Sequence, residues 1–222
     1  LLSSAISAYG EPELESNKIE TQNLEKQQTI NSKNYYLINS LDEIDKWIEE
    51  AEEVGEVAVD TETTSLDPHQ ADLVGISLCS KIGKACYIPV GHKSPKCLKK
   101  DAVIKKLKKI LEDPSIKKIG QNIKFDFIVL YKCGITLSSM EDTMLMSYVL
   151  DAGKNRHNMD TLSEIHLGHK TISFKDMVGT GKKEINFSEV ELDKAKDYAA
   201  EDADVTFRSV SYTHLRAHET IL

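Results

Sequence analysis

Five residues have types and spacings that could together support phosphodiester hydrolysis. Asp60 and Glu62 stand two positions apart at the end of the β-branched run VAVDTET, and because side chains alternate along a strand, both would project from one face. Tyr198 and Asp202 stand four positions apart in YAAEDAD, which places them one turn apart on one face of a helix. A further carboxylate, Asp126, lies in GQNIKFDF. The pattern predicts an acidic cluster with a phenol beside it.

Clustered carboxylates predict a site for hard divalent cations. Mg²⁺ prefers oxygen ligands, and two such ions a few ångströms apart can stabilise both the attacking and the leaving oxygen of an in-line displacement at phosphorus. Each motif alone has a simpler interpretation. Asp60 and Glu62 could end a strand at a polar turn, Asp126 could oppose a helix dipole, and the Tyr198 motif could lie on a solvated helix face. Only the combination favours a metal site.

The order of the motifs, D-x-E, then N-x-x-x-D, then Y-x-x-x-D, resembles that of the DEDDy 3′-5′ exonucleases. The segments DTETTSLD, CYIPVGH, IGQNIKFD, HKTISF and YAAEDADVT resemble one branch in particular, the proofreading exonuclease domain of family A DNA polymerases, the bacterial DNA polymerase I group. The similarity runs from about residue 35 to residue 208. Three ordered motifs within long matching segments are far more specific than one acidic pair.

This resemblance implies a role for each residue of the cluster. Asp60 would bridge two divalent metal ions, Mg²⁺ with Mn²⁺ or Zn²⁺ as alternatives. Glu62 and Asp202 would complete the shell of the first ion, and Asp126 would hold the second, partly through water. Tyr198 would orient the attacking water, because a phenol with a pKa near ~10 is a donor at neutral pH. Further contacts with the substrate strand would come from residues outside the cluster: Leu66, Gln121, Asn122 and Arg156.

The implied reaction is the release of nucleoside 5′-monophosphates from a DNA 3′ end that is single-stranded or frayed, as the proofreading step of replication and repair. A polymerase domain would follow on the C-terminal side in the intact protein, which would act as a monomer. Two alternatives stay open: a catalytically silent module that guides the strand, and an RNA-trimming DEDDy exoribonuclease of the ribonuclease D kind. The retained carboxylates argue against the first, and the long match to the polymerase branch argues against the second.

Composition sets broader limits. With 222 residues, 40% hydrophobic and 29% charged, the chain reads as an ordinary globular domain. The absence of an apolar stretch of roughly 18 to 20 residues and of a secretion signal predicts a cytoplasmic, nucleoid-associated protein with no membrane contact. The net charge of −8 gives no general attraction for phosphate, so bound cations must reverse the field locally. The four cysteines include no C-x-x-C pair, which argues against zinc ribbons and disulfide frameworks.

Other polar residues carry weaker predictions. Position alone favours a packing role for Leu66, and a surface or salt-bridge role for Arg156 unless it faces the acidic cluster. His166 and His169 lack a carboxylate or cysteine partner at ligand spacing, which favours an exposed or hydrogen-bonded role over zinc binding. The lysine run over residues 99–109 is typical of a solvated helix face rather than a DNA-binding patch.

The chain divides into three parts by composition. Residues 1–33 are polar, without an apolar period, and are expected to be a disordered tail or linker. Residues 34–208 form the predicted exonuclease domain. Residues 209–222 do not follow the family and resemble an artificial or sequencing-derived scar, so the helix that carries Tyr198 and Asp202 could be cut short.

Periodicity and turn signals predict the elements that position the cluster. Strands are predicted at residues 35–38, 57–61, 73–80, 85–90 and 116–120, and helices at residues 40–53, 101–112, 141–150, 159–167 and 192–208. Asp126 is predicted in the first turn of a further helix. Ser40 and Glu43 form an S-x-x-E capping signature for the first helix. A mixed β-sheet flanked by helices matches the α/β ribonuclease H-like fold that the resemblance implies.

Overall fold

The computed structural model describes residue 30 and residues 32–219, with side chains described as far as Val210. Most of the predicted tail, residues 1–29, therefore lies outside the described residues. The strands are β1 Tyr35–Leu37, β2 Glu56–Thr63, β3 Leu73–Lys81, β4 Lys84–Pro89, β5 Lys117–Gly120 and β6 Met140–Asp142. The α-helices are α3 Leu41–Val54, α4 Lys100–Leu111, α5 Lys124–Lys132, α6 Thr143–Leu150, α7 Met159–Leu167, α8 Phe174–Val178 and α9 Leu192–Glu219. Short 3₁₀ turns are η1 Ser32–Asn34, η2 Gly181–Lys183 and η3 Phe187–Glu189.

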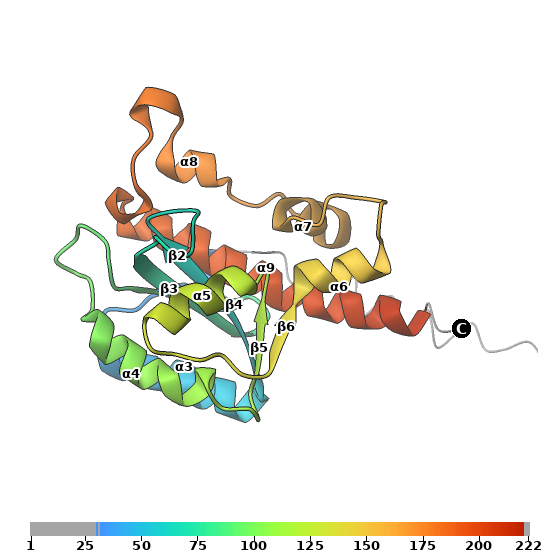
Figure 1. Cartoon of the computed structure of the whole chain (residues 1–222), viewed down its shortest axis with the longest axis horizontal. Helices are drawn as coiled ribbons and strands as arrows, with labels where there is room; N and C mark the ends of the chain where they lie inside the picture. Colours follow the sequence, from blue (N-terminus) through green and yellow to red (C-terminus); the bar gives the residue numbers. More distant parts are fainter. Residues whose placement is uncertain (1–29, 31, 220–222) are drawn as a thin grey trace, which may run out of the picture.

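Within the described residues, six strands form one mixed sheet in the order β1-β4-β3-β2-β5-β6. The consecutive strands β2, β3 and β4 pair antiparallel, as the predicted meander requires. Strand β1 joins β4 in parallel, and β5 and β6 extend the β2 edge in parallel. Helices α3 and α4 lie on one side of the sheet, and α9 crosses the other (Figure 1). The predicted class, a mixed sheet flanked by helices, is what the chain adopts.

The helix ends show how local chemistry sets the elements. The Ser40 hydroxyl accepts from the Glu43 backbone N–H, which caps α3, and Gly55 ends the helix in the left-handed conformation. The Glu43 carboxylate accepts from the Asn39 backbone N–H at 3.0 Å, one residue before the position a capping box would use. The predicted helix from residue 141 instead begins at Thr143, because Asp142 caps α6 and residues 140–142 pair with β5.

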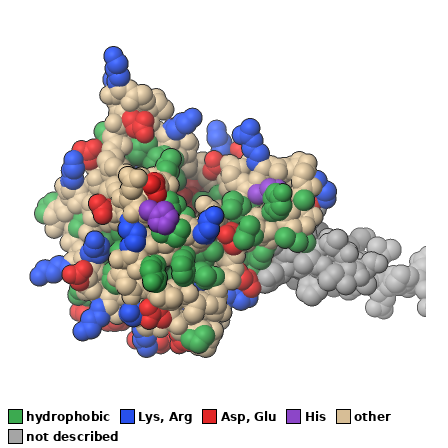
Figure 2. Space-filling model, viewed as in Figure 1, with side chains coloured by type: hydrophobic (Ala, Val, Ile, Leu, Met, Phe, Trp, Pro, Cys, Tyr) green, Lys and Arg blue, Asp and Glu red, His purple; other side chains and the backbone are tan. Residues whose placement is uncertain are grey.

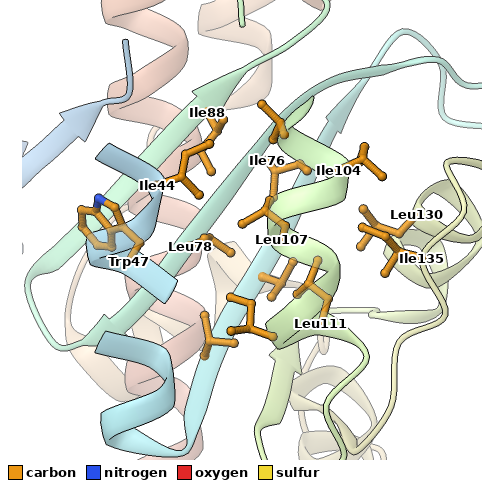
Figure 3. Close-up of a cluster of buried hydrophobic side chains, with 14 of the residues drawn as sticks. Ile44, Trp47, Ile76, Leu78, Ile88, Ile104, Leu107, Leu111, Leu130 and Ile135 are labelled. Carbon is orange, nitrogen blue, oxygen red and sulfur yellow. The ribbon is translucent and has the colours of Figure 1, made fainter. Parts of the chain in front are cut away.

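The face of the sheet under α3 and α4 holds the larger apolar core. Side chains that alternate along β2 and β3, among them Val57, Val59, Ile76 and Leu78, pack against α3, α4 and α5. Figure 3 shows Ile44 and Trp47 of α3, Leu107 and Leu111 of α4 and Leu130 of α5 converging on these strands. This continuous apolar layer gives the sheet a rigid base for the residues on its other face.

Helix α9 lies on the opposite face through small side chains, Ala200 and Ala203, against Ala58 and Cys79 of the sheet. Asp204 ties the helix to the sheet, and within α9 it also pairs with Arg208, whose Nε donates to Asp204 Oδ1 at 2.9 Å. The Asp204 carboxylate also accepts from the Tyr35 hydroxyl at 2.9 Å and from the Gly83 backbone N–H at 2.8 Å.

The helix continues without a break to Glu219. The segment predicted as an unrelated tail therefore begins as part of α9, and Ser209 and Val210 are buried. In the described part of the chain, no helix is long and apolar enough to span a bilayer.

Candidate metal centre

Strand β2 presents Asp60 and Glu62 on the face that α9 covers. Glu62 pairs with Gly75 across the β2–β3 ladder, and a Cβ on Gly75 would lie 2.1 Å from the Tyr87 hydroxyl. A glycine is therefore required where the Tyr87 ring fills the space next to Glu62. The Tyr87 hydroxyl in turn contacts His92 Nε2 at 2.7 Å, and both side chains are buried. These contacts fill the α9 face of the sheet beside Glu62.

The first turns of α9 bring Tyr198 and Asp202 to the same place. One carboxylate oxygen from each of Asp60, Glu62 and Asp202 lies within 4.8 Å of the others. Glu62 and Asp202 are buried, and Asp60 is half-buried. A strand and a helix that are far apart in the sequence thus form one oxygen-lined cluster, open on the Asp60 side.

Asp126 lies beside this cluster and is held by Thr61, the residue between Asp60 and Glu62 on β2. The Asp126 Oδ1 accepts from the Thr61 backbone N–H at 2.9 Å and from the Thr61 hydroxyl at 2.6 Å. Asp126 is buried in the first turn of α5. Sequence reasoning assigned no role to Thr61, although it is the central residue of D-T-E and on a strand must point opposite to its neighbours.

The cluster carries uncompensated negative charge. Within the described residues, none of the four carboxylates forms an ion pair with Lys, Arg or His. Burial raises the pKa of Asp60 to about 6. The pKa of Glu62, Asp126 and Asp202 is raised well above its ordinary range, first by burial and next by the charge of Asp60. Buried carboxyl groups that repel one another are hard to ionise without a positive partner. This arrangement fits a site in which a hard divalent cation neutralises the carboxylates.

Tyr198 stays a hydrogen-bond donor in this environment. Burial raises the pKa of its phenol far above 10, and the neighbouring charge of Asp202 raises it further. A hydrogen bond from the Tyr198 hydroxyl to Asp202 partly lowers the pKa of that carboxyl. The phenol can therefore orient a polar ligand but cannot act as a base near neutral pH.

A cavity of about 610 Å³ opens over the carboxylates. Its polar floor is formed by Asp60, Glu62, Tyr198 and Asp202, and its walls include the apolar side chains of Phe125, Met159, Phe174 and Phe187. The Phe174 ring stacks on Phe187 with centroids 6.0 Å apart and an interplanar angle of 6°. The volume lies in the range of small-ligand sites, in which mostly apolar walls surround a few polar groups. Sequence reasoning did not single out the aromatic wall.

The four residues predicted to contact substrate differ in position. Leu66 is 87% exposed and lines the cavity rim. The Gln121 amide is occupied within the protein, because its Nε2 donates to the His157 carbonyl at 2.7 Å and its Oε1 accepts from the Thr143 hydroxyl at 2.5 Å. Asn122 adopts a left-handed backbone with φ 59°.

Arg156 is exposed and, in the part of the chain that the structure describes, forms no ion pair. Among the described residues that line the cavity, Gln121, Asn122 and Arg156 are absent. The structure therefore brings Leu66 to the cavity and leaves the other three outside it.

A buried glutamate on α9 secures the segment that leads into the aromatic wall. The Glu201 carboxylate contacts His169 Nε2 at 2.9 Å and accepts from the Ile172 backbone N–H at 2.6 Å. These bonds tie the connection between α7 and α8 to the helix that carries Tyr198. Sequence reasoning missed this residue, because Glu201 in YAAEDAD is one of several acids and nothing local marks it as buried.

Comparisons with known proteins agree with this geometry. A family model described as 3′-5′ exonuclease matches residues 35–216. The chain is 45% identical over 196 residues to DNA polymerase I of Rhizobium leguminosarum, covering 78% of the chain and 19% of the relative. It is 46% identical over 170 residues to DNA polymerase I of Pseudomonas aeruginosa, covering 74% and 19%. The chain thus spans about a fifth of the length of these relatives.

Solved structures show the same architecture. Brucella melitensis NrnC is 25% identical with a TM-score of 0.64, and the match covers 84% of this chain and 82% of that one. Escherichia coli RNase D is 18% identical with a TM-score of 0.63, covering 84% and 46%. These neighbours have the ribonuclease H-like fold, which confirms the predicted fold class.

Proposed function

Since this chain belongs to the 3′-5′ exonuclease family of the DNA polymerase I enzymes, we propose that it removes nucleoside 5′-monophosphates from DNA 3′ ends by two-metal hydrolysis, as the proofreading part of such a polymerase. The observation that carries the proposal is the trio of carboxylates within 4.8 Å of one another, with no cation of the described chain paired to them. Water would add to the terminal phosphorus, the bond from phosphorus to O3′ would break, and the proton would pass to the 3′-hydroxyl of the shortened strand.

The donor set fits hard divalent cations. Asp60, Glu62 and Asp202 would hold one ion, and Asp126 would hold the second with Asp60 shared between them. An all-oxygen set favours Mg²⁺ over softer metals, with Mn²⁺ or Zn²⁺ as substitutes. When bound, such ions supply an activated water and stabilise charge on the phosphate oxygens.

The protein's own residues would orient the reactants. Thr61 fixes the Asp126 carboxylate through two hydrogen bonds, which limits the positions that a second ion can take. Tyr198 would donate a hydrogen bond to the attacking water or the scissile phosphate. Leu66 at the rim and Phe174 on the wall would pack against the sugar and base of the last nucleotides, with apolar and stacking contacts that accept any base. Gln121, Asn122 and Arg156 would contact the strand farther from the chemistry.

The polymerase relatives favour DNA as the substrate. They are 45% and 46% identical to the chain, whereas the exoribonuclease RNase D shares only 18%. In the intact protein we place a polymerase domain on the C-terminal side, and we expect a cytoplasmic monomer that receives frayed or single-stranded 3′ ends. An RNA-trimming enzyme and a silent strand guide are the alternatives.

The test is a time course of hydrolysis with a 5′-labelled single-stranded DNA in Mg²⁺, with EDTA and Asp60→Ala as controls and an RNA strand of equal sequence in parallel. We expect stepwise shortening of the DNA from its 3′ end that both controls abolish. Faster shortening of the RNA would instead assign a ribonuclease. A folded protein that binds Mg²⁺ and leaves both strands intact would assign the guiding role.

A further inference from the structure

A loop of residues 179–186, here called the lysine loop, joins α8 to η3 and projects from the body of the fold (Figure 1). Its last part, residues 184–186, lines the cavity, and Lys182 and Lys183 lie next to it in the η2 turn. Both lysines are exposed, and Figure 2 shows Lys side chains at the end of this projection. The loop therefore carries two exposed ammonium groups directly before the residues that line the cavity.

We propose that Lys182 and Lys183 bind backbone phosphates of a single-stranded nucleic acid whose 3′ end occupies the cavity. This inference rests on the proposed function and adds to it a strand-binding site outside the catalytic cavity. The ligand class is the phosphodiester backbone itself, independent of base sequence.

Hydrogen bonds hold the lysine loop in one shape. The Ile185 backbone N–H donates to the Val178 carbonyl at 2.8 Å, and that of Glu184 donates to the Gly181 carbonyl at 3.1 Å. The Asn186 Nδ2 donates to the Thr64 carbonyl at 2.9 Å, which joins the loop to the segment that carries Leu66. The lysine backbone is therefore positioned before a ligand arrives, which lowers the ordering cost of binding.

No carboxylate of the described residues neutralises the two ammonium groups. In the described residues, neither Lys182 nor Lys183 forms an ion pair, whereas Lys93 and Lys84, for example, are paired with glutamates. The chain carries a net charge of −8, and the cavity floor is acidic, so a polyanion is repelled unless cations meet it at the entrance. Lysines bind phosphates as point charges, and each contact releases a counterion from the strand.

The surroundings of the lysine loop favour a single strand over other polyanions. Ile185 and Phe174 are 41% and 39% exposed, and both line the cavity beside the loop. Apolar surface for bases next to cations for phosphates is the arrangement of single-strand binding grooves. Because the cavity would take the 3′-terminal nucleotides, the phosphates that precede them must leave it, and the lysine loop is one of the segments that border it.

The test compares K182Q/K183Q with K99Q/K100Q. Lys99 and Lys100 are likewise adjacent and exposed, and they lie at the start of α4 on the other side of the sheet. Both double variants change the net charge by the same amount. Binding of a fluorescent single-stranded DNA, with phosphorothioate 3′ linkages that resist hydrolysis, is measured in Mg²⁺ over a series of salt concentrations. Hydrolysis of the p-nitrophenyl ester of thymidine 5′-monophosphate, which has no upstream phosphates, is measured in parallel.

We expect K182Q/K183Q to weaken binding on the order of tenfold at 0.1 M salt and to reduce the slope of log affinity against log salt by about 1.4, which is about 0.7 for each lost contact. K99Q/K100Q should bind as the unmodified protein does, and ester hydrolysis should be unchanged in both. Equal binding in the two variants, or a loss of ester hydrolysis in K182Q/K183Q, would overturn the inference. An unmodified protein that binds the strand through the lysine loop but hydrolyses neither the ester nor a DNA strand with ordinary phosphodiester linkages would refute the proposed function alone.

Discussion

The face of the sheet under α3 and α4 is filled with branched apolar side chains, whereas the face under α9 carries small side chains, the three clustered carboxylates of Asp60, Glu62 and Asp202, and an ion pair. The apolar face contributes transfer free energy in proportion to the area it removes from water. On the other face, burial and mutual repulsion disfavour the ionised forms of the Asp60, Glu62 and Asp202 carboxyl groups. The apolar face stabilises the fold, which offsets the destabilising repulsion among the carboxylates that the other face holds in place for a cation.

The two buried charge groups on the α9 face are themselves unlike. Asp204 and Arg208 neutralise each other, and the Asp204 carboxylate also accepts from the Tyr35 hydroxyl and the Gly83 backbone N–H. In the described chain, the carboxylates at the cavity have no Lys, Arg or His side chain as an ion-pair partner. Substitutions on the two faces, and in the two charge groups, should therefore separate stability from activity.

The largest effect is expected from Asp60→Ala. Hydrolysis should fall by at least about 10³-fold, equivalent to about 4 kcal/mol of transition-state stabilisation, because a shared metal ligand is lost. The free energy of unfolding in EDTA should stay the same or rise, since repulsion among the acids is relieved. Steady-state hydrolysis and urea unfolding measure the two quantities. A large loss of stability would show that the cluster belongs structurally with the apolar face.

Asp204→Ala should lower the free energy of unfolding by about 3–5 kcal/mol, because it removes the carboxylate that neutralises the buried Arg208 and that accepts from Tyr35 and Gly83. Urea unfolding measures this loss. Lys93→Ala is the matched control: it breaks the exposed pair with Glu189, which should cost less than about 1 kcal/mol. Similar losses in the two variants would mean that the buried contacts of Asp204 do not anchor α9.

Leu107→Ala should lower the free energy of unfolding by about 2–5 kcal/mol, since Leu107 is fully buried in the apolar layer (Figure 3). At saturating Mg²⁺ and at a temperature where the variant stays folded, hydrolysis should be nearly unchanged. Leu145→Ala, at a side chain that is 58% exposed, should leave both quantities in place. A selective loss of activity in Leu107→Ala would contradict the division between the faces.

The smallest effect is a dependence on pH in the metal-free protein. The pKa of Asp60 is raised from 3.8 to about 6 on folding, so between these values the folded state binds more protons than the unfolded state. This contribution of Asp60 to stability should be fully present below pH ~4 and should be lost as the pH rises through about 6, by up to about 1.4 kcal/mol per pH unit. Unfolding in EDTA at several pH values measures the slope. Asp202→Asn and added Mg²⁺ should each flatten it, and a stability that rises over this interval would contradict the raised pKa.

The sequence was sufficient for the elements whose residues repeat along one strand or one helix. Alternation placed Asp60 and Glu62 on β2, and the helical period placed Tyr198 and Asp202 on α9. Contacts between elements were not readable in this way. Strand β6 is three residues long and exists because β5 pairs with it, and the Gln121 amide meets His157 through the fold rather than through any local signal. The aromatic wall around Phe174 depends on where α8 crosses α9, which no periodicity encodes.

Because α9 is uninterrupted, it can tilt as a rigid rod about Asp204, where it is hydrogen-bonded to Tyr35 and Gly83. The anchor at Asp204 lies about 9 Å along the helix axis from Tyr198 and about 22 Å from Glu219, at 1.5 Å per residue. A sideways displacement of 1 Å at Glu219 therefore moves Tyr198 by only about 0.4 Å, within the ~0.5 Å tolerance of catalytic geometry. Motions of whatever is joined to the far end of α9 reach the carboxylates reduced by more than half.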